Sequence, residues 1–142
     1  MDVDEQVEDL LNTLNQRYTS GRRKLVAALQ TGDGPLTIHQ ILDCDSSLAQ
    51  SSVYRNLMIL EEAGAVSRIA VSDEYARYEL AESLTGHHHH LICTDCGDVT
   101  DFSLDAEIEK LLDKALHAAA KKIDFLEMNH RLDIVGRCGQ CS

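Results

Sequence analysis

The chain has 142 residues and a formal net charge of −11, and 44% of its residues are hydrophobic but only 4% are aromatic. This length allows one domain or two small ones, and the apolar fraction is enough to build a folded core. No stretch approaches the roughly 20 apolar residues that span a bilayer, and the acidic N-terminal stretch lacks the layout of a signal peptide. We therefore expect a cytoplasmic protein with no membrane partner, in which nucleic-acid binding would require a local concentration of basic residues.

Four short helices are expected before residue 64. Apolar residues recur there at helical spacing, in segments separated by polar and glycine-containing turns. Thr37 is the expected cap of the third helix, and Ser46 or Ser47 is expected to open the fourth. The predicted helices are residues 3–15, 20–30, 37–42 and 48–63.

After Gly64 the pattern changes to short alternating runs. The runs at 66–70 and 75–79 predict two strands joined through Ser72-Asp73-Glu74, a β-hairpin or wing. Helices followed by a wing are the outline of a winged helix-turn-helix, in which the helix before the wing enters the major groove of DNA.

The predicted fourth helix and the residues around the second carry side chains suited to DNA. Between Leu10 and Leu60 there are five basic and three acidic residues, so this segment is net positive inside an acidic chain. Arg, Gln, Ser and Tyr side chains reach base edges or phosphates. The same residues also fit ordinary solvated helix faces. The candidate DNA-binding residues are Arg17, Arg22, Gln50, Ser51, Ser52, Tyr54 and Arg55.

The remainder of the chain is predicted to mix strands with one helix. Strands are expected at 88–92, 99–102 and 130–135, and an amphipathic helix at 104–122. Three strands and one helix make a thin core, so a second copy of the chain would supply the missing cover. We therefore predict an α+β fold, with an N-terminal winged helix-turn-helix followed by a small α/β domain that dimerises.

Two Cys-x-x-Cys pairs indicate a structural metal site. Four thiolates are the ligand set of a tetrahedral structural zinc ion and leave no position open for water or substrate. Because 41 residues separate the pairs, the ion would join the two ends of a domain. A thiol redox enzyme is the alternative, but two Cys-x-x-Cys pairs and a neighbouring histidine run are a poor fit to such an enzyme. The four ligands are Cys93, Cys96, Cys138 and Cys141, and the remaining Cys44 is expected to be a buried or half-buried thiol.

Four consecutive histidines, residues 87–90, come just before the first cysteine pair. In a strand, successive side chains point to opposite faces, so two imidazoles would lie on each face. Each pair is half of a metal site, and one short run can therefore serve two ions. The alternative is a solvated histidine-rich loop or an expression tag.

Several segments spread over nearly the whole chain together match one known family. They are residues 18–23, 52–57, 61–64, 87–97 and 129–138. On these residues the chain resembles the ferric uptake regulator (Fur) superfamily of bacterial metal-responsive repressors. The resemblance implies a winged-helix DNA-binding domain over 1–82, a hinge over 83–86, and a zinc-stapled α/β dimerisation domain over 87–142.

The resemblance also implies metal ligands. It assigns a structural zinc ion to the four paired cysteines. It implies a regulatory hinge site and a second dimerisation-domain site, with Glu107 as the alternative to Glu109, and it leaves open whether the second site senses metal or stabilises the dimer. Nitrogen and oxygen ligands suit Fe²⁺ or Zn²⁺, and also Mn²⁺ or Ni²⁺. The hinge set is Glu79, His88, His90 and Asp101, and the second set is His87, His89, Glu109 and His130.

One position departs from the family pattern. Many members place a histidine of the DNA-binding domain in the hinge site just before the third helix, where this chain has Pro35. His39 is nearby but falls inside the predicted helix. The hinge site is therefore expected to be closed by the other four residues alone.

These features together predict a regulator and not an enzyme. We expect a homodimeric repressor of metal uptake or homeostasis genes that binds double-stranded operator DNA when its regulatory metal is bound. A peroxide-sensing repressor of the same fold is the alternative.

Overall fold

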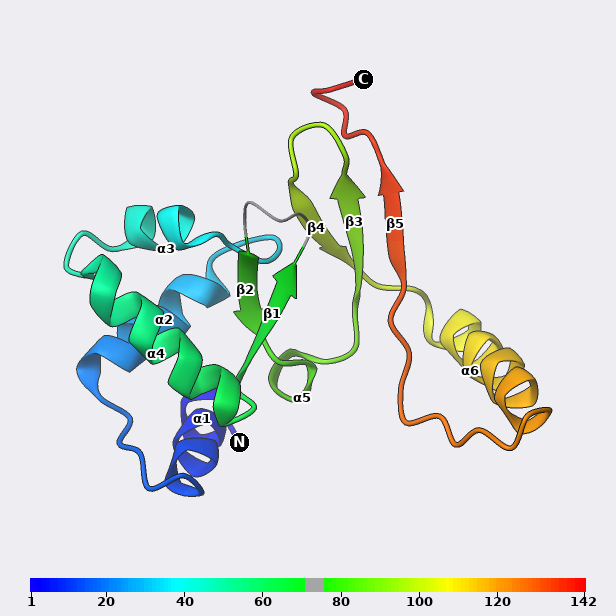
Figure 1. The fold of residues 1–142 in the computed structure, drawn as a ribbon, viewed down its shortest axis with the longest axis horizontal. Helices are drawn as coiled ribbons and strands as arrows, with labels where there is room; N and C mark the ends of the chain where they lie inside the picture. The colour runs from blue at the N-terminus through cyan, green and yellow to red at the C-terminus, as the bar shows by residue number, and fades with distance from the viewer. Residues whose placement is uncertain (71–75) are drawn as a thin grey trace.

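The computed structural model describes residues 1–70 and 76–142, and it places them in two groups of elements (Figure 1). Four helices and a two-stranded antiparallel sheet form the N-terminal group. These elements are α1 (Val3–Asn12), α2 (Ser20–Gln30), α3 (Ile38–Cys44), α4 (Gln50–Glu62), β1 (Val66–Ala70) and β2 (Ala76–Leu80).

Local capping chemistry sets where these helices begin. Thr19 caps α2, and Thr37 caps α3 through a capping box with Gln40. The fourth helix begins at Gln50, two residues after the predicted start. The reason is that the backbone N–H and the hydroxyl of Ser47 both donate to Asp45 Oδ1, at 2.9 and 2.6 Å, so this serine closes a separate turn.

The predicted wing is present as the pair β1 and β2, which run from Val66 opposite Leu80 to Ala70 opposite Ala76. Leu36 adds a further bridge, because its backbone N–H and C=O each bond Tyr78 at 2.8 Å. The predicted turn Ser72-Asp73-Glu74 and the predicted strand residue Tyr75 lie outside the described residues.

A single apolar core holds the N-terminal group together. Its members come from all four helices and both strands, and Leu11, Leu25, Ile41 and Leu57 are at most 1% exposed. Burial of apolar side chains of this size is the main favourable term in folding. The core therefore explains why the helices and the wing form one unit.

A short helix, whose Leu84 packs against the N-terminal core, leads to a C-terminal group that contains a three-stranded sheet and a long helix. Strand order is β4-β3-β5, with β3 antiparallel to β4 and parallel to β5. The third strand begins at Asp133 and not at His130 as predicted, since its pairing with β3 starts opposite His90. The elements are α5 (Glu82–Thr85), β3 (His89–Cys93), β4 (Val99–Phe102), α6 (Ala106–Lys121) and β5 (Asp133–Gly136).

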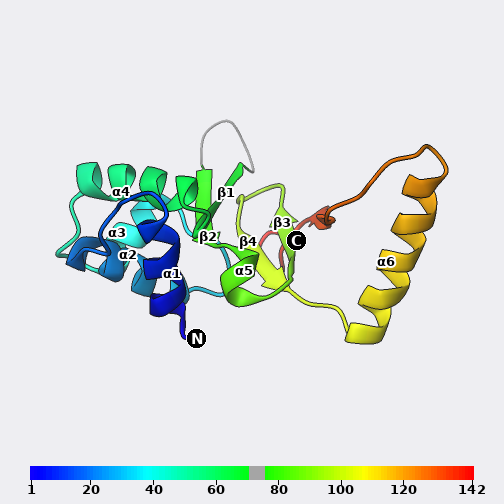
Figure 2. The same ribbon diagram turned by 90° about the horizontal axis from the view of Figure 1, so that it is seen from below.

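Helix α6 stands away from the sheet in both views of the chain (Figures 1 and 2). None of its residues is buried, and Ile108 and Leu111 are exposed. The arrangement confirms the predicted α+β fold, a winged helix followed by a small α/β domain. Across the parts of the chain that the structure describes, no helix is both long and apolar enough to cross a membrane.

Candidate metal centres and DNA-binding face

Four side chains converge where the two groups of elements meet. Glu79 extends from β2, His88 lies just before β3, His90 lies in β3, and Asp101 lies on β4. Their ligand atoms all lie within 4.8 Å of one another. Glu79 Oε1 is 3.0 Å from His88 Nε2 and 2.8 Å from His90 Nε2. The structure therefore brings together the four residues that the resemblance implies for the hinge site.

The electrostatics of this hinge cluster suit a divalent cation. Burial and the negative charge of Glu79 together raise the pKa of Asp101 to about 6. Burial alone would also raise the pKa of Glu79, but the hydrogen bonds from His90 and His88 outweigh it and lower that pKa. Asp101 Oδ1 is buried 3.3 Å from His90 Nε2, yet it has no hydrogen-bond partner among the described residues. A bound cation would satisfy this oxygen and offset the charge of the two carboxylates.

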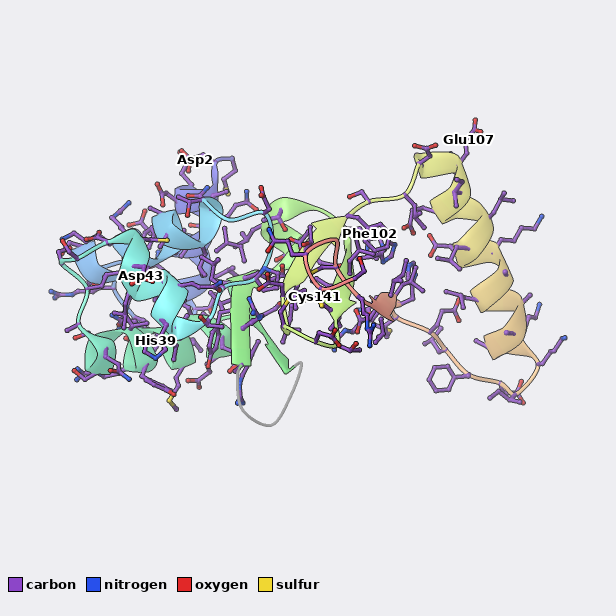
Figure 3. All side chains as sticks on the ribbon, turned by 90° about the horizontal axis from the view of Figure 1, so that it is seen from above. Asp2, His39, Asp43, Phe102, Glu107 and Cys141 are labelled. Atoms are coloured by element: carbon purple, nitrogen blue, oxygen red, sulfur yellow. The ribbon has the colours of Figure 1, made fainter. Side chains whose placement is uncertain are left out.

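A second cluster lies on the opposite side of the histidine run. His87 and His89 meet His130, from the segment before β5, and Glu109, from the first turns of α6. The Nε2 atoms of His87 and His130 are 3.0 Å apart, and Glu109 Oε2 is 3.3 Å from His130 Nε2. Glu109 Oε1 also contacts His89 Nε2. The structure brings Glu109 into the cluster and leaves Glu107 outside it, at the start of α6 (Figure 3).

Residues outside the predicted ligand sets contact the other ring nitrogen of several histidines. Asp133 Oδ1 lies 3.4 Å from His90 Nδ1, and Asp113 Oδ1 lies 3.1 Å from His130 Nδ1. Glu82 of α5 contacts His87 Nδ1 in the same way, at 3.2 Å. Such partners fix the tautomer that leaves Nε2 free to bind a metal. Sequence reasoning missed them, because only the pairing of β3 with β5 places Asp133 opposite His90.

The four paired cysteines form the third cluster. Their sulfur atoms lie within 4.8 Å of one another, and the Sγ atoms of Cys96 and Cys138 are 3.8 Å apart. Backbone N–H groups of Cys96 and Cys138 donate to Cys93 and lower the pKa of its thiol to about 6. A thiol that ionises easily, in a group of four, fits a tetrahedral zinc ion.

Pro35, which departs from the family pattern, and the nearby His39 both lie outside the hinge cluster. Pro35 is fully buried, and its carbonyl oxygen accepts a 3.4 Å hydrogen bond from Arg77. His39 is exposed on α3, and it belongs to none of the ligand clusters found among the described residues (Figure 3).

Most candidate DNA-binding residues lie on one exposed face. Gln50, Ser51, Tyr54 and Arg55 are exposed on α4, and Ser52 is half-buried. Tyr54 is 52% and Met58 is 69% exposed, and the two lie one turn apart on this face of α4. Arg17 is also exposed, before α2.

Arg22 and Cys44 differ from the sequence-based expectations. The Arg22 side chain is buried and donates to Asn56 Oδ1, Gln16 Oε1 and the carbonyl of Arg17, at 3.0, 3.1 and 2.7 Å. Its guanidinium therefore joins α2 to α4 and does not reach outward to phosphate. Cys44, the last residue of α3, is exposed and not buried.

Comparison with known proteins extends the resemblance to whole chains. The Ferric uptake regulator family model matches residues 13–134. The ferric uptake regulation protein of Brucella abortus biovar 1 (strain 9-941) is 34% identical over 131 residues, covering 89% of this chain and 88% of that protein. The peroxide-responsive repressor PerR of Staphylococcus saprophyticus is 28% identical over 146 residues, covering 98% and 93%.

Solved structures agree with the sequence matches. The Helicobacter pylori ferric uptake regulator Fur, whose structure is described as revealing three functional metal binding sites, has a TM-score of 0.73 and 26% identity. That comparison covers 98% of this chain and 91% of the other. This chain belongs to the ferric uptake regulator family of metal-responsive transcription regulators.

Proposed function

We propose that this chain is a homodimeric repressor that binds operator DNA when a divalent metal fills the hinge cluster, and that it controls genes of metal uptake or homeostasis. The observation that carries the proposal is the origin of the four ligands. Glu79 belongs to the wing, whereas His88, His90 and Asp101 follow α5 and belong to the C-terminal sheet. One cation bound to all four would hold the winged helix in one position relative to that sheet.

This position matters because two winged helices must reach half-sites on one face of the DNA. A metal that binds one domain arrangement better than others shifts the population toward it, and coupling of about 1–3 kcal/mol is typical. A bound cation also offsets part of the net charge of −11 that repels DNA. The exposed face of α4, with Gln50, Ser51, Tyr54 and Arg55, is the surface proposed to enter the major groove.

The other two clusters are proposed to stabilise the C-terminal domain. Zinc bound by the four cysteines would join β3 to the segment after β5, and its binding free energy would be folding free energy. A metal at His87, His89, Glu109 and His130 would join α6 to the sheet. Without it, no residue of α6 is buried against the sheet. The hinge and second clusters offer nitrogen and oxygen ligands, which suit Fe²⁺ or Zn²⁺ and also Mn²⁺ or Ni²⁺.

A fluorescence-anisotropy titration of labelled upstream DNA tests the proposal. Protein that retains its cysteine-bound zinc would be titrated without oxygen at buffered free concentrations of each candidate metal. We expect one metal to raise DNA affinity in the wild-type protein and in the control His39→Ala, and to have no effect on His90→Ala. Equal metal-dependent affinity in His90→Ala would rule out the hinge cluster as the switch.

A peroxide-sensing repressor is the second candidate function, and two observations support it. PerR of S. saprophyticus matches almost the whole chain, and the hinge cluster includes the carboxylate of Asp101. In such a sensor, His88 and His90 would help to hold an iron(II) ion that supplies the chemistry by which peroxide oxidises one of them, adding one oxygen atom to the histidine and releasing water. Mass spectrometry after iron(II) and peroxide treatment would detect one added oxygen on the peptide that contains His88 and His90. If the peptide is unmodified and DNA binding is retained, the peroxide-sensing function is rejected and only the metal-sensing function remains.

A further inference from the structure

The segment from Asp33 to Leu36 joins the two sheets by backbone hydrogen bonds. At one end, Leu36 exchanges two hydrogen bonds of 2.8 Å with Tyr78 of β2. At the other end, the carbonyl of Asp33 accepts a 3.1 Å hydrogen bond from the backbone N–H of Asp101 on β4. Because β4 is an edge strand of its sheet, this segment covers backbone groups that would otherwise lack a strand partner.

Gly34 brings the same segment into direct contact with β4. A Cβ atom built on Gly34 would lie 2.5 Å from the carbonyl oxygen of Val99 and 3.2 Å from the Cα of Thr100. Both neighbours are backbone atoms, which cannot move aside as the end of a side chain can. The close approach of the two groups of elements therefore depends on the absence of a side chain at this position.

Arg77 adds a charged contact at the same junction. Its side chain is buried on β2, and its guanidinium donates to the Pro35 carbonyl at 3.4 Å and to Gln40 Oε1 at 3.2 Å. Both of these bonds use Nη1, and Nη2 is 3.3 Å from Asp98 Oδ1, in the turn that follows Cys96. A buried guanidinium needs this carboxylate as its partner, since its other acceptors are uncharged.

We propose that Asp33, Gly34, Arg77 and Asp98 form a junction lock, a contact that positions the winged helix against the C-terminal sheet without metal. Its parts are the backbone bond from Asp101 to Asp33, the Gly34 contact with β4, and the ion pair between Arg77 and Asp98. Arg77 acts as a positioning residue, because Glu79 lies two places further along the same strand and so extends from the same face. The lock therefore presents Glu79 to His88 and His90 before any cation arrives.

This inference deepens the proposed function, because a hinge that is partly ordered in advance binds its metal at lower cost. It predicts that the metal-free protein spends much of its time in the closed arrangement, so metal completes an existing contact. The lock itself needs neither metal nor DNA. It can therefore be tested separately from the repressor function.

Amide hydrogen exchange followed by NMR gives a direct test. The Asp101 amide reports on the junction, the Tyr78 amide on the winged helix, and the Cys93 amide, which bonds the Asp98 carbonyl at 2.9 Å, on the C-terminal sheet. The protein would retain its cysteine-bound zinc, with the hinge metal removed. We expect the wild-type Asp101 amide to be protected, and Gly34→Ala to lower its protection factor by about tenfold or more while the Tyr78 and Cys93 amides stay protected.

Two further variants keep the test decisive. Gly21→Ala is the matched control, because its added Cβ would meet nothing closer than 3.7 Å. Asp98→Asn removes only the charge at a side chain that is 62% exposed, so it tests the ion pair if Gly34→Ala unfolds. We expect Asp98→Asn to lower Asp101 protection a few-fold, an effect that high salt should reproduce in the wild-type protein.

Either of two results would overturn the lock. One is a wild-type Asp101 amide that exchanges as fast as an exposed amide. The other is that the Asp101 amide is as well protected in Asp98→Asn as in the control Gly21→Ala, and equally so in Gly34→Ala if that variant folds. As a second readout, Co²⁺ binding followed by its visible absorption should be weaker in Asp98→Asn by several-fold, with zinc content unchanged.

Discussion

The histidine rings of the two nitrogen-rich clusters use their two nitrogens differently. All five direct Nε2 at the other members of their cluster. On the opposite side, Nδ1 of His90 faces Asp133, Nδ1 of His130 faces Asp113, and Nδ1 of His88 faces the Gly86 carbonyl. His89 is the exception, because its buried Nδ1 has no hydrogen-bond partner in the described part of the chain. Ring orientation is therefore set mainly by groups that do not belong to the clusters themselves.

The orienting carboxylates give a paired prediction. Asp133→Asn should weaken metal binding at the hinge cluster by about tenfold, because the His90 ring loses its charged partner. Asp113→Asn should weaken the second cluster by a similar factor and leave the hinge cluster unchanged. Isothermal titration of each variant with Mn²⁺ or Co²⁺ would separate the two effects. Identical binding curves for both variants would contradict independent roles.

At the scale of elements, helix α1 packs its apolar face on the core and also makes a polar contact with Tyr18. Val7 and Leu11 are fully buried, and the Tyr18 hydroxyl donates a 2.6 Å hydrogen bond to Asp4 Oδ1. Burial and this hydrogen bond to Asp4 both raise the pKa of Tyr18 above its usual value near 10. The folded state therefore favours the protonated phenol.

This contact predicts how Tyr18→Phe behaves with pH. At neutral pH the variant should be less stable by about 1 kcal/mol, the usual worth of such a hydrogen bond. A raised pKa contributes stability that is present below the unfolded value and lost above it, so the advantage of the wild type should shrink as pH rises past 10. Urea unfolding of both proteins at neutral and alkaline pH measures the difference. A constant difference across that range would contradict the assignment.

The cysteine cluster predicts a change in the C-terminal elements. Cys141→Ser should lose the bound zinc and destabilise the sheet, because the segment after β5 is then no longer joined to Cys93. Cys44→Ser is the matched control, since Cys44 is exposed and outside the cluster. Zinc content and thermal unfolding should change only in Cys141→Ser. A fully stable sheet without zinc would show that the cluster is not structural.

Elements with strong local signals could be predicted from the sequence, and contacts between distant segments could not. The cap at Thr37, the strand in the histidine run and the two cysteine pairs have local signals, and the structure has all three, with the strand at His89–Cys93, one residue later than predicted. The start of α4 was wrong because Ser47 bonds Asp45 and not the helix. The buried contacts of Arg22 could not be predicted, because its acceptor Asn56 lies 34 residues away. Asp133 and Asp98 were missed for the same reason, since only folding brings them to His90 and Arg77.

At the scale of the whole molecule, the C-terminal sheet and helix α6 carry several exposed large apolar side chains. Leu91 of β3 and Ile134 of β5 are paired neighbours in the sheet, and they are 41% and 49% exposed. Val135 is 61% exposed on the opposite face of the sheet, and α6 adds Leu111 at 68%. Such a surface is typical of a protein–protein interface. It supports the proposed homodimer, in which a partner covers the sheet and the helix.

A pair of aspartate variants distinguishes this surface from the DNA-binding face. Ile134→Asp should shift the protein toward the monomer, because a charge would be buried without a partner in the dimer. Met58→Asp alters another exposed apolar residue, on α4, and should stay dimeric while losing DNA affinity. Analytical ultracentrifugation measures the first effect and anisotropy the second. A dimeric Ile134→Asp protein would place the interface elsewhere.

The alternation of the histidine run also restricts how the length of this chain could change during evolution. The run is held in register by Cys93, so one residue inserted between His90 and Cys93 would shift every histidine back one place on the strand. The place of His90 would then hold another residue, while the places of His87 and His89 would still hold histidines. Deleting one residue there has the opposite result, because Gly86 would take the place of His87 while both hinge positions kept imidazoles. A single codon gained or lost at this point would therefore remove one cluster and preserve the other.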